Sequence, residues 1–203
     1  MLEYLQKKLT MADRIYLSPP HLGSREKELL VEALESNWVA PVGPHLDAWE
    51  REICEKTKAA GCCLLNSATA AIHVALRLLE VGPGDLVFIQ SHTHIGSVNP
   101  IIYLGATPVF IDSEPDSWNM SPVHLDNAIA MANEGKLKGA QGKKPKAIIP
   151  VHLYGMPANM DAILSVAKKY NLPLVEDAAE SLGSTYKGRH TGTIGDIGVY
   201  SFN

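Results

Sequence analysis

The sequence predicts an α/β fold of three layers, in which a mostly parallel sheet is covered by helices on both faces. Short apolar runs alternate with helical stretches from residue 61 to residue 202, which is typical of βαβ units. The runs are continuously apolar, as strands buried on both faces require. The chain has 203 residues, of which 46% are hydrophobic, so it is long enough to bury one sizeable core.

The first part of the chain predicts two helices joined by a loop. Residues 24–37 carry apolar side chains at helical spacing, and Ser24 is a candidate N-cap. Residues 37–45 are rich in proline and glycine and predict a loop. In residues 46–56, apolar side chains three to four positions apart fall on one face of a second helix.

From residue 61 onward, strands and helices are expected in regular alternation. The expected strands are 61–66, 86–91, 107–113, 146–153, 172–179 and 196–202. The expected helices are 67–81, 95–106, 121–133 and 160–171, and residues 186–192 predict a turn between short strands. The helix at 121 has the clearest start, because Ser121 can cap it and Pro122 suits the first helical position.

Composition and charge narrow the class of protein. The formal net charge is −4 without a basic stripe, which argues against a nucleic-acid partner. No apolar stretch is long enough to predict a membrane-spanning helix. The three cysteines lack metal-ligand spacing, which favours reduced thiols in a cytoplasm. A second methionine, Met11, indicates that residues 1–12 are an N-terminal extension and that the domain covers 13–203.

Candidate functional residues follow the expected strands, because ligands of such sheets bind beyond the carboxyl ends of the strands. Ala68 and Thr69 are small residues at a helix N-terminus, where N–H groups and the helix dipole suit a phosphate. A simple N-cap is the alternative, and this stretch alone favours it. Neither a dinucleotide fingerprint nor a P-loop is present.

Two further stretches carry chemistry. His92 and His94 follow the strand at 86–91, but no carboxylate or cysteine flanks them, so stacking of a ring on a flat cofactor is favoured over a metal site. Asp177 ends an apolar strand, and Glu180 lies three residues further on. A buried carboxylate is costly without a positive partner, so a cationic ligand group explains Asp177 better than a helix N-cap does.

These motifs occur together in one known family. "NSATAAIHVAL", "SHTHIGS" and "VEDAAESLGSTYKGRHTGTIGDIGVYSFN" follow one another in the order and spacing of the DegT/StrS sugar aminotransferases, which the chain resembles from about Ile15 to its end. These are pyridoxal-phosphate (PLP) enzymes of the aspartate-aminotransferase fold. The resemblance therefore implies the large domain of a fold type I PLP-transferase. "SNWVAPVG" and "VHLYGMPANMD" resemble the branch of UDP-N-acetylbacillosamine type, which aminates UDP-4-keto-6-deoxy-N-acetylglucosamine.

The resemblance also implies roles for individual residues. Asp177 matches the acid that pairs with the pyridine nitrogen of PLP and keeps it protonated. His94 matches the ring that stacks on the cofactor, and Glu180 lies near the phenolic oxygen, where many members carry glutamine. The phosphate-binding residues implied are Ala68, Thr69 and Ser201. No metal is implied.

The family's Schiff-base lysine would be the third residue past Asn203, and a C-terminal small domain would follow. We therefore expect the chain to be the truncated N-terminal part of the enzyme and to be inactive by itself. The family also implies glutamate as amino donor, pyridoxamine phosphate as the intermediate cofactor form, a homodimer, and a role in bacterial surface-glycan or glycoprotein sugar synthesis. Two alternatives remain open, a sugar dehydratase of the same family and a non-catalytic fragment.

Overall fold

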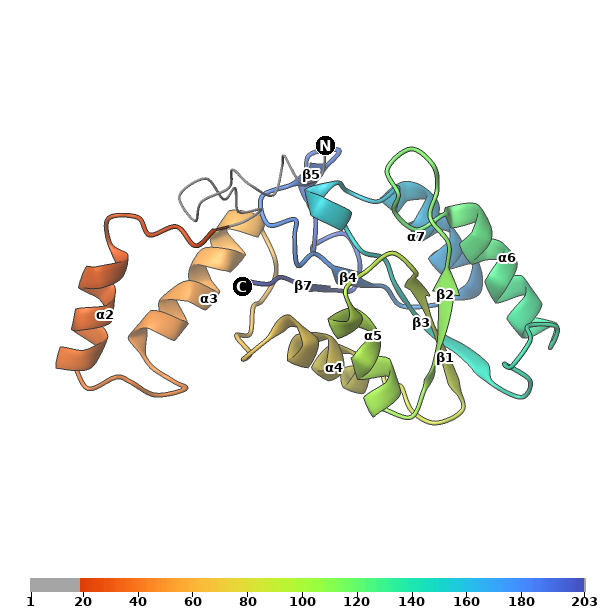
Figure 1. Cartoon of the computed structure of the whole chain (residues 1–203), viewed down its shortest axis with the longest axis horizontal. Coiled ribbons are helices and arrows are strands. Elements are labelled where there is room, and N and C mark those ends of the chain that lie inside the picture. The colour runs from red at the N-terminus through yellow and green to blue at the C-terminus, as the bar shows by residue number, and fades with distance from the viewer. Residues whose placement is uncertain (1–18, 203) are drawn as a thin grey trace, which may run out of the picture. The chain divides into compact units, whose positions relative to one another are not determined.

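A computed structural model describes residues 19–202 (Figure 1). The chain divides into two compact units, Met1–Asp47 and Ala48–Asn203. The expected N-terminal extension, residues 1–12, lies outside the described residues.

The first unit contains helix α2, Glu26–Glu35, and the beginning of α3, Pro44–Thr57. Arg25 occupies the N-cap position of α2 and makes no side-chain cap, so the expectation that Ser24 caps this helix is wrong. Although α2 has the expected helical spacing, none of its residues is buried. Its stability therefore owes little to packing within this unit.

The second unit is built on parallel strands. Its main strands are β1 Asp85–Gln90, β2 Thr107–Ile111, β3 Lys144–Ile149, β4 Val175–Asp177 and β7 Ile197–Val199. Hydrogen bonding gives the order β2-β1-β3 and, separately, β4-β7, all parallel. Single parallel bridges from Ile148 to Leu174 and from Val151 to Asp177 place β4 beside β3. Two very short strands, β5 Thr185–Tyr186 and β6 Arg189–His190, form the antiparallel hairpin expected around residues 186–192.

Four helices cover this sheet, two on each face (Figure 1). They are α4 Ala68–Leu78 and α5 Ile95–Tyr103 on one face, and α6 Pro122–Asn133 and α7 Met160–Tyr170 on the other. Ser121 caps α6 by accepting a hydrogen bond from the His124 N–H at 3.3 Å, and Pro122 begins the helix, as expected. A 3₁₀ turn, η2 Leu153–Gly155, joins the end of β3 to α7.

The core consists of two apolar clusters that share the sheet. Phe88 and Ile148 point towards α6 and α7, whereas their neighbours Ile89 and Ile149 point towards α4 and α5. Successive strand residues face opposite sides of a sheet, so continuous apolar runs fill both clusters at once. The predicted three-layer arrangement is confirmed.

The expected strand at 61–66 is the main error in the predicted elements. This stretch has no regular secondary structure and pairs with no strand among the described residues. Its backbone is held by a side chain instead, because the Leu64 N–H donates to Glu50 Oε1 at 2.8 Å. An apolar run predicts burial, but a strand also needs a neighbour with an open edge, which the run itself does not reveal.

The core makes a direct prediction about stability. Ile129 of α6 is fully buried, and replacing it with alanine should lower the free energy of unfolding by about 2–5 kcal/mol through lost burial and a residual cavity. Val123 on the same helix is 68% exposed, so Val123→Ala should change it by less than about 0.5 kcal/mol. Urea unfolding followed by circular dichroism measures both, and equal losses would contradict this packing.

Candidate active site

Asp177 occupies the carboxyl end of β4 and is 3% exposed. Its Oδ2 accepts a hydrogen bond from the Ser97 hydroxyl at 2.5 Å, and its Oδ1 accepts one from the Ala179 N–H at 3.1 Å. Ser97 lies in the first turns of α5, so this bond joins the helix to the strand. The carboxylate is thus fixed in direction before any ligand contacts it.

The surroundings of Asp177 disfavour its charge. Burial raises the pKa of the Asp177 carboxyl, and the nearby Glu180 carboxylate adds to this rise. The hydrogen bonds from Ser97 and Ala179 oppose the rise without cancelling it. None of the ion pairs found between residues 19 and 202 involves Asp177. A cationic ligand group opposite this carboxylate would stabilise its ionised form.

The backbone of Asp177 is held by the neighbouring strand. Its N–H donates to the Pro150 carbonyl oxygen at 2.9 Å, and its own carbonyl oxygen accepts the His152 N–H at 3.0 Å. On the other side, Asp177 is in register with Val199 of β7. Ser201 therefore follows only two residues after the partner of Asp177, on the same carboxyl edge of the sheet.

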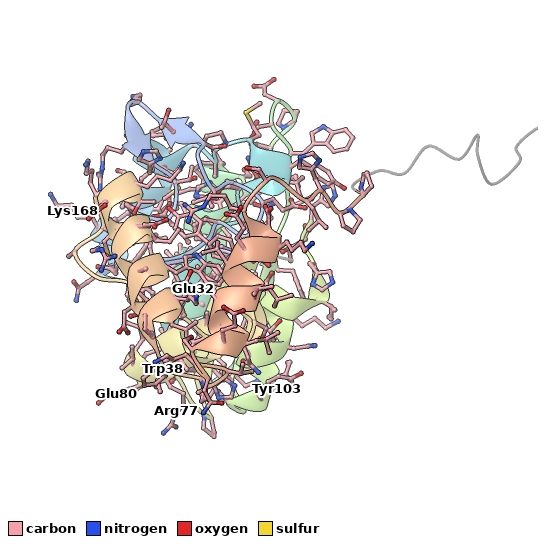
Figure 2. The ribbon with its side chains drawn as sticks, turned by 90° about the vertical axis from the view of Figure 1, so that its left-hand side faces the viewer. Glu32, Trp38, Arg77, Glu80, Tyr103 and Lys168 are labelled. Atoms are coloured by element: carbon pink, nitrogen blue, oxygen red, sulfur yellow. The ribbon has the colours of Figure 1, made fainter. Side chains whose placement is uncertain are left out.

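The N-termini of α4 and α5 approach each other beside this acid. A Cβ atom added to Gly96 would lie 2.7 Å from Thr69 Oγ1, so only glycine allows this approach. One to two turns further on, the His73 and Tyr103 rings are 6.0 Å apart. The two helices therefore run side by side in the same direction. Figure 2 shows Arg77 and Tyr103 where the helices end.

The N-terminus of α4 has the geometry of an anion site. Ser67 caps the helix through the Ala70 N–H at 3.1 Å, which is the simple capping role considered for this stretch. The cap leaves other N–H groups available, because the first N–H groups of a helix, here those of Ala68 and Thr69, have no acceptor within the helix. With the Thr69 hydroxyl, they suit an anionic group such as a phosphate.

His94 is the N-cap of α5 and remains exposed at its ring. Its Nδ1 accepts the Gly96 N–H at 3.0 Å, which fixes the orientation of the ring and places the proton of a neutral imidazole on Nε2. Thr93 Oγ1 lies 3.0 Å from Ser97 Oγ, so the loop that carries His94 also supports the serine that holds Asp177. A flat ring fixed at the start of α5 suits stacking on a flat cofactor.

Glu180 is placed differently from the other candidates. Its side chain is exposed, and its Oε2 accepts the Tyr154 N–H at 2.7 Å. Tyr154 has a positive φ of 51° and is 77% exposed, so Glu180 stabilises an uncommon backbone conformation in η2, the turn that follows β3. This contact directs one carboxylate oxygen towards the loop after β3.

Several buried polar residues around the site had no signal in the sequence. Gln90 bridges two loops, donating to the His92 carbonyl oxygen at 2.8 Å and accepting the Met120 N–H at 2.7 Å. Asn119 holds the turn after β3 through the Leu153 N–H and the Met156 carbonyl oxygen. Ser97 lies 80 positions before Asp177, so only the folded chain reveals their contact.

A shallow groove elsewhere on the second unit, between α6 and α7, does not include these residues. It is lined by Pro122, Val123, Asp126, Asn127, Ala162, Ser165, Val166 and Lys169. The Asp126–Lys169 ion pair within the groove is solvent-exposed, and such pairs contribute little. The carboxyl edge of the sheet therefore remains the candidate active site.

The parallel sheet with helices on both faces matches the fold of PLP-dependent aminotransferases. The chain belongs to the DegT/DnrJ/EryC1/StrS aminotransferase family, whose profile matches residues 20–203. EpsN of Bacillus subtilis (strain 168), assigned as a pyridoxal phosphate-dependent aminotransferase, is 50% identical over 95% of this chain and 48% of its own length. GDP-perosamine synthase of Caulobacter vibrioides is 36% identical over 93% of this chain and 48% of its own length.

Solved structures agree with this family. Spr1654 of Streptococcus pneumoniae, assigned as a sugar aminotransferase, matches in its PLP form with a TM-score of 0.81 and 35% identity over 93% of this chain and 49% of that chain. Its PMP form matches equally well over 48% of that chain. The cofactor expected from the sequence is therefore confirmed at the level of the family. The chain spans about half the length of the curated relatives that it matches.

The buried acid predicts a conflict between stability and function. Because burial raises the pKa of Asp177 above its unfolded value of about 3.9, the group favours folding only at low pH and opposes it once ionised. In cofactor-free protein, Asp177→Asn should therefore raise the melting temperature at pH 7, and the gain should shrink as the pH falls towards 4. Thermal melting at several pH values measures this.

Asp126→Asn is the matched control. The hydrogen bond from Lys169 lowers the pKa of Asp126, so this carboxyl favours folding at neutral pH and loses that effect as the pH falls. Its substitution should lower the melting temperature slightly at pH 7. A drop in melting temperature for both variants at pH 7 would contradict the assigned burial penalty of Asp177.

Proposed function

We propose that this chain is part of a PLP-dependent aminotransferase that transfers the amino group of glutamate to a nucleotide-linked 4-keto-6-deoxy sugar, with UDP as the nucleotide. The observation that carries the proposal is the buried Asp177 carboxylate, held by Ser97 beside two helix N-termini. Family membership and the 50% identity to EpsN support transamination over the alternatives.

The residues of the site fit PLP group by group. Asp177 would pair with the pyridine nitrogen, and the N-terminus of α4 with Thr69 would hold the phosphate, helped by Ser201. His94 would stack on the ring, and Glu180 would lie near the phenolic oxygen. When bound, the cofactor supplies an electron sink for the carbanion formed during amino transfer. The chain's own residues would fix its position and keep its ring nitrogen protonated.

The identity of the nucleotide sugar is the finer part of this proposal. The stretches "SNWVAPVG" and "VHLYGMPANMD" support a UDP-linked substrate through their resemblance to the UDP-N-acetylbacillosamine branch. The GDP-perosamine synthases among the relatives define GDP-linked sugars as the competing class.

No helix between residues 19 and 202 is long and apolar enough to cross a membrane. We further propose a cytoplasmic homodimer, as the family resemblance implies.

Isotope transfer tests the function directly. The protein expressed from its complete reading frame is incubated with PLP, ¹⁵N-glutamate and either UDP-4-keto-6-deoxy-N-acetylglucosamine or a GDP-linked keto sugar. We expect ¹⁵N in the UDP-sugar product by mass spectrometry, and a loss of activity of about 10²-fold or more in Asp177→Ala, because the ring nitrogen loses its counter-charge. Val123→Ala, which changes a solvent-exposed side chain of α6, should retain full activity.

Each other outcome has a distinct meaning. Label in the GDP-sugar alone would overturn the UDP assignment but not the transamination. Loss of a sugar hydroxyl without ¹⁵N incorporation would favour a dehydratase.

A further inference from the structure

A second acidic side chain, Glu176, is buried directly beside Asp177 in β4. It is 0% exposed and points to the opposite face of the sheet, as successive strand residues do. Its Oε1 accepts the N–H groups of Ile194 and Gly195, both at 2.6 Å. Its Oε2 accepts the Gly192 N–H and contacts His152 Nε2, both at 2.9 Å. Each oxygen of this carboxylate therefore accepts two hydrogen bonds.

His152 is equally buried, and each of its ring nitrogens has a hydrogen-bond partner. Its Nδ1 accepts the Ala158 N–H at 3.1 Å, so the ring proton must be on Nε2, from which it is donated to Glu176. The pair therefore carries one negative charge, that of Glu176. Burial would raise the pKa of Glu176, but the hydrogen bonds from His152, Gly195 and Gly192 lower it overall.

The Glu176–His152 pair joins three segments at the carboxyl edge of the sheet. His152 follows β3, Glu176 lies in β4, and residues 192–195 lead into β7. His152 is also tied to the acid of the site, because its backbone N–H donates to the Asp177 carbonyl oxygen at 3.0 Å. One carboxylate thus sets the relative position of β3, β4 and the segment that enters β7.

The same contacts extend to Ser201. A Cβ atom at Gly198 of β7 would overlap the Gly192 carbonyl oxygen, so this segment packs directly on the strand. The Tyr200 hydroxyl donates to the Thr191 carbonyl oxygen. Burial and the charge of Glu176 raise the pKa of Tyr200 to about 12, which keeps this donor protonated. Residues 191 and 192, once fixed by Glu176, therefore fix the residue before Ser201.

We infer that Glu176 and His152 are positioning residues for Asp177 and Ser201, an inference that rests on the proposed PLP site. The irregular segment 192–195 directs three N–H groups at one point, which no neighbouring strand could satisfy. Only an anion accepts all of them, and an apolar side chain would leave them unpaired. The Glu176 carboxylate therefore stabilises the backbone conformation of residues 192–195. Through this segment it sets the spacing between Asp177 and Ser201.

The test uses protein from the complete reading frame without substrate. Glu176→Gln keeps the size of the side chain but turns an NH₂ group towards donors, and His152→Leu removes the imidazole. Each should weaken PLP binding, measured by visible absorbance, by about 10- to 100-fold, because misplaced groups lose the bound geometry. Each should also speed deuterium exchange in residues 176–178 and 196–202.

Two comparisons separate positioning from loss of stability. His152→Gln can both donate to Glu176 and accept from Ala158, so its PLP affinity should stay within about threefold of wild type. Ile129→Ala should destabilise the same unit while leaving PLP affinity and exchange in residues 196–202 unchanged. Equal weakening by Ile129→Ala, or wild-type affinity in Glu176→Gln, would overturn the inference. If Glu176→Gln does not fold, the PLP affinity of His152→Leu tests the inference instead, because this variant keeps the Glu176 carboxylate and its three N–H donors in place.

The outcomes also separate this inference from the proposed function. A wild-type protein that binds PLP but aminates no sugar would overturn the proposed substrate while leaving the positioning test intact. If the wild-type protein binds no PLP, the proposed cofactor site fails. Exchange in residues 176–178 and 196–202 then decides alone whether Glu176 and His152 position these strands, and unchanged exchange in both variants would overturn that as well.

Discussion

The burial of one carboxylate, that of Asp177, is the constraint on which the rest of the candidate site depends. An acid at 3% exposure can persist only if its surroundings supply hydrogen bonds, and Ser97 and Ala179 supply them. Ser97 can reach it only if α5 starts beside the end of β4. That start in turn needs the glycine at 96, because Thr69 of α4 occupies the adjacent space.

Glu176 and Asp177 show how neighbouring acids in one strand acquire opposite properties. Both are buried, yet the pKa of Glu176 is lowered and that of Asp177 is raised. Glu176 accepts hydrogen bonds from three backbone N–H groups and from His152, whereas Asp177 has two donors. Burial disfavours the charged form of both carboxyls, so the number of hydrogen-bond donors decides whether each pKa is raised or lowered. A fully satisfied carboxylate is suited to structure, and a partly satisfied one is suited to binding a cation.

Much of the fold was predictable because it depends on local patterns. Continuous apolar runs located the paired strands, and Ser121 with Pro122 marked the start of α6. The prediction of a strand at 61–66 was wrong because strand pairing depends on a neighbour that is distant in the chain. The prediction that Ser24 caps α2 was wrong because Arg25 occupies the N-cap position. The cofactor residues were inferred from a family resemblance. Ser97, Glu176 and His152 were missed because their roles arise from contacts between segments far apart in the chain.

The electrostatic layout of the site determines the direction in which a bipolar ligand can bind. The N-termini of α4 and α5 present partial positive charge, while Asp177 presents negative charge at the end of β4. A ligand with an anionic end and a protonated ring nitrogen is stabilised in one orientation only. Reversing it would place the anion against a buried carboxylate whose charge is already disfavoured, and the cation against the helix termini. The orientation of such a ligand therefore follows from the parallel start of two helices beside one buried acid.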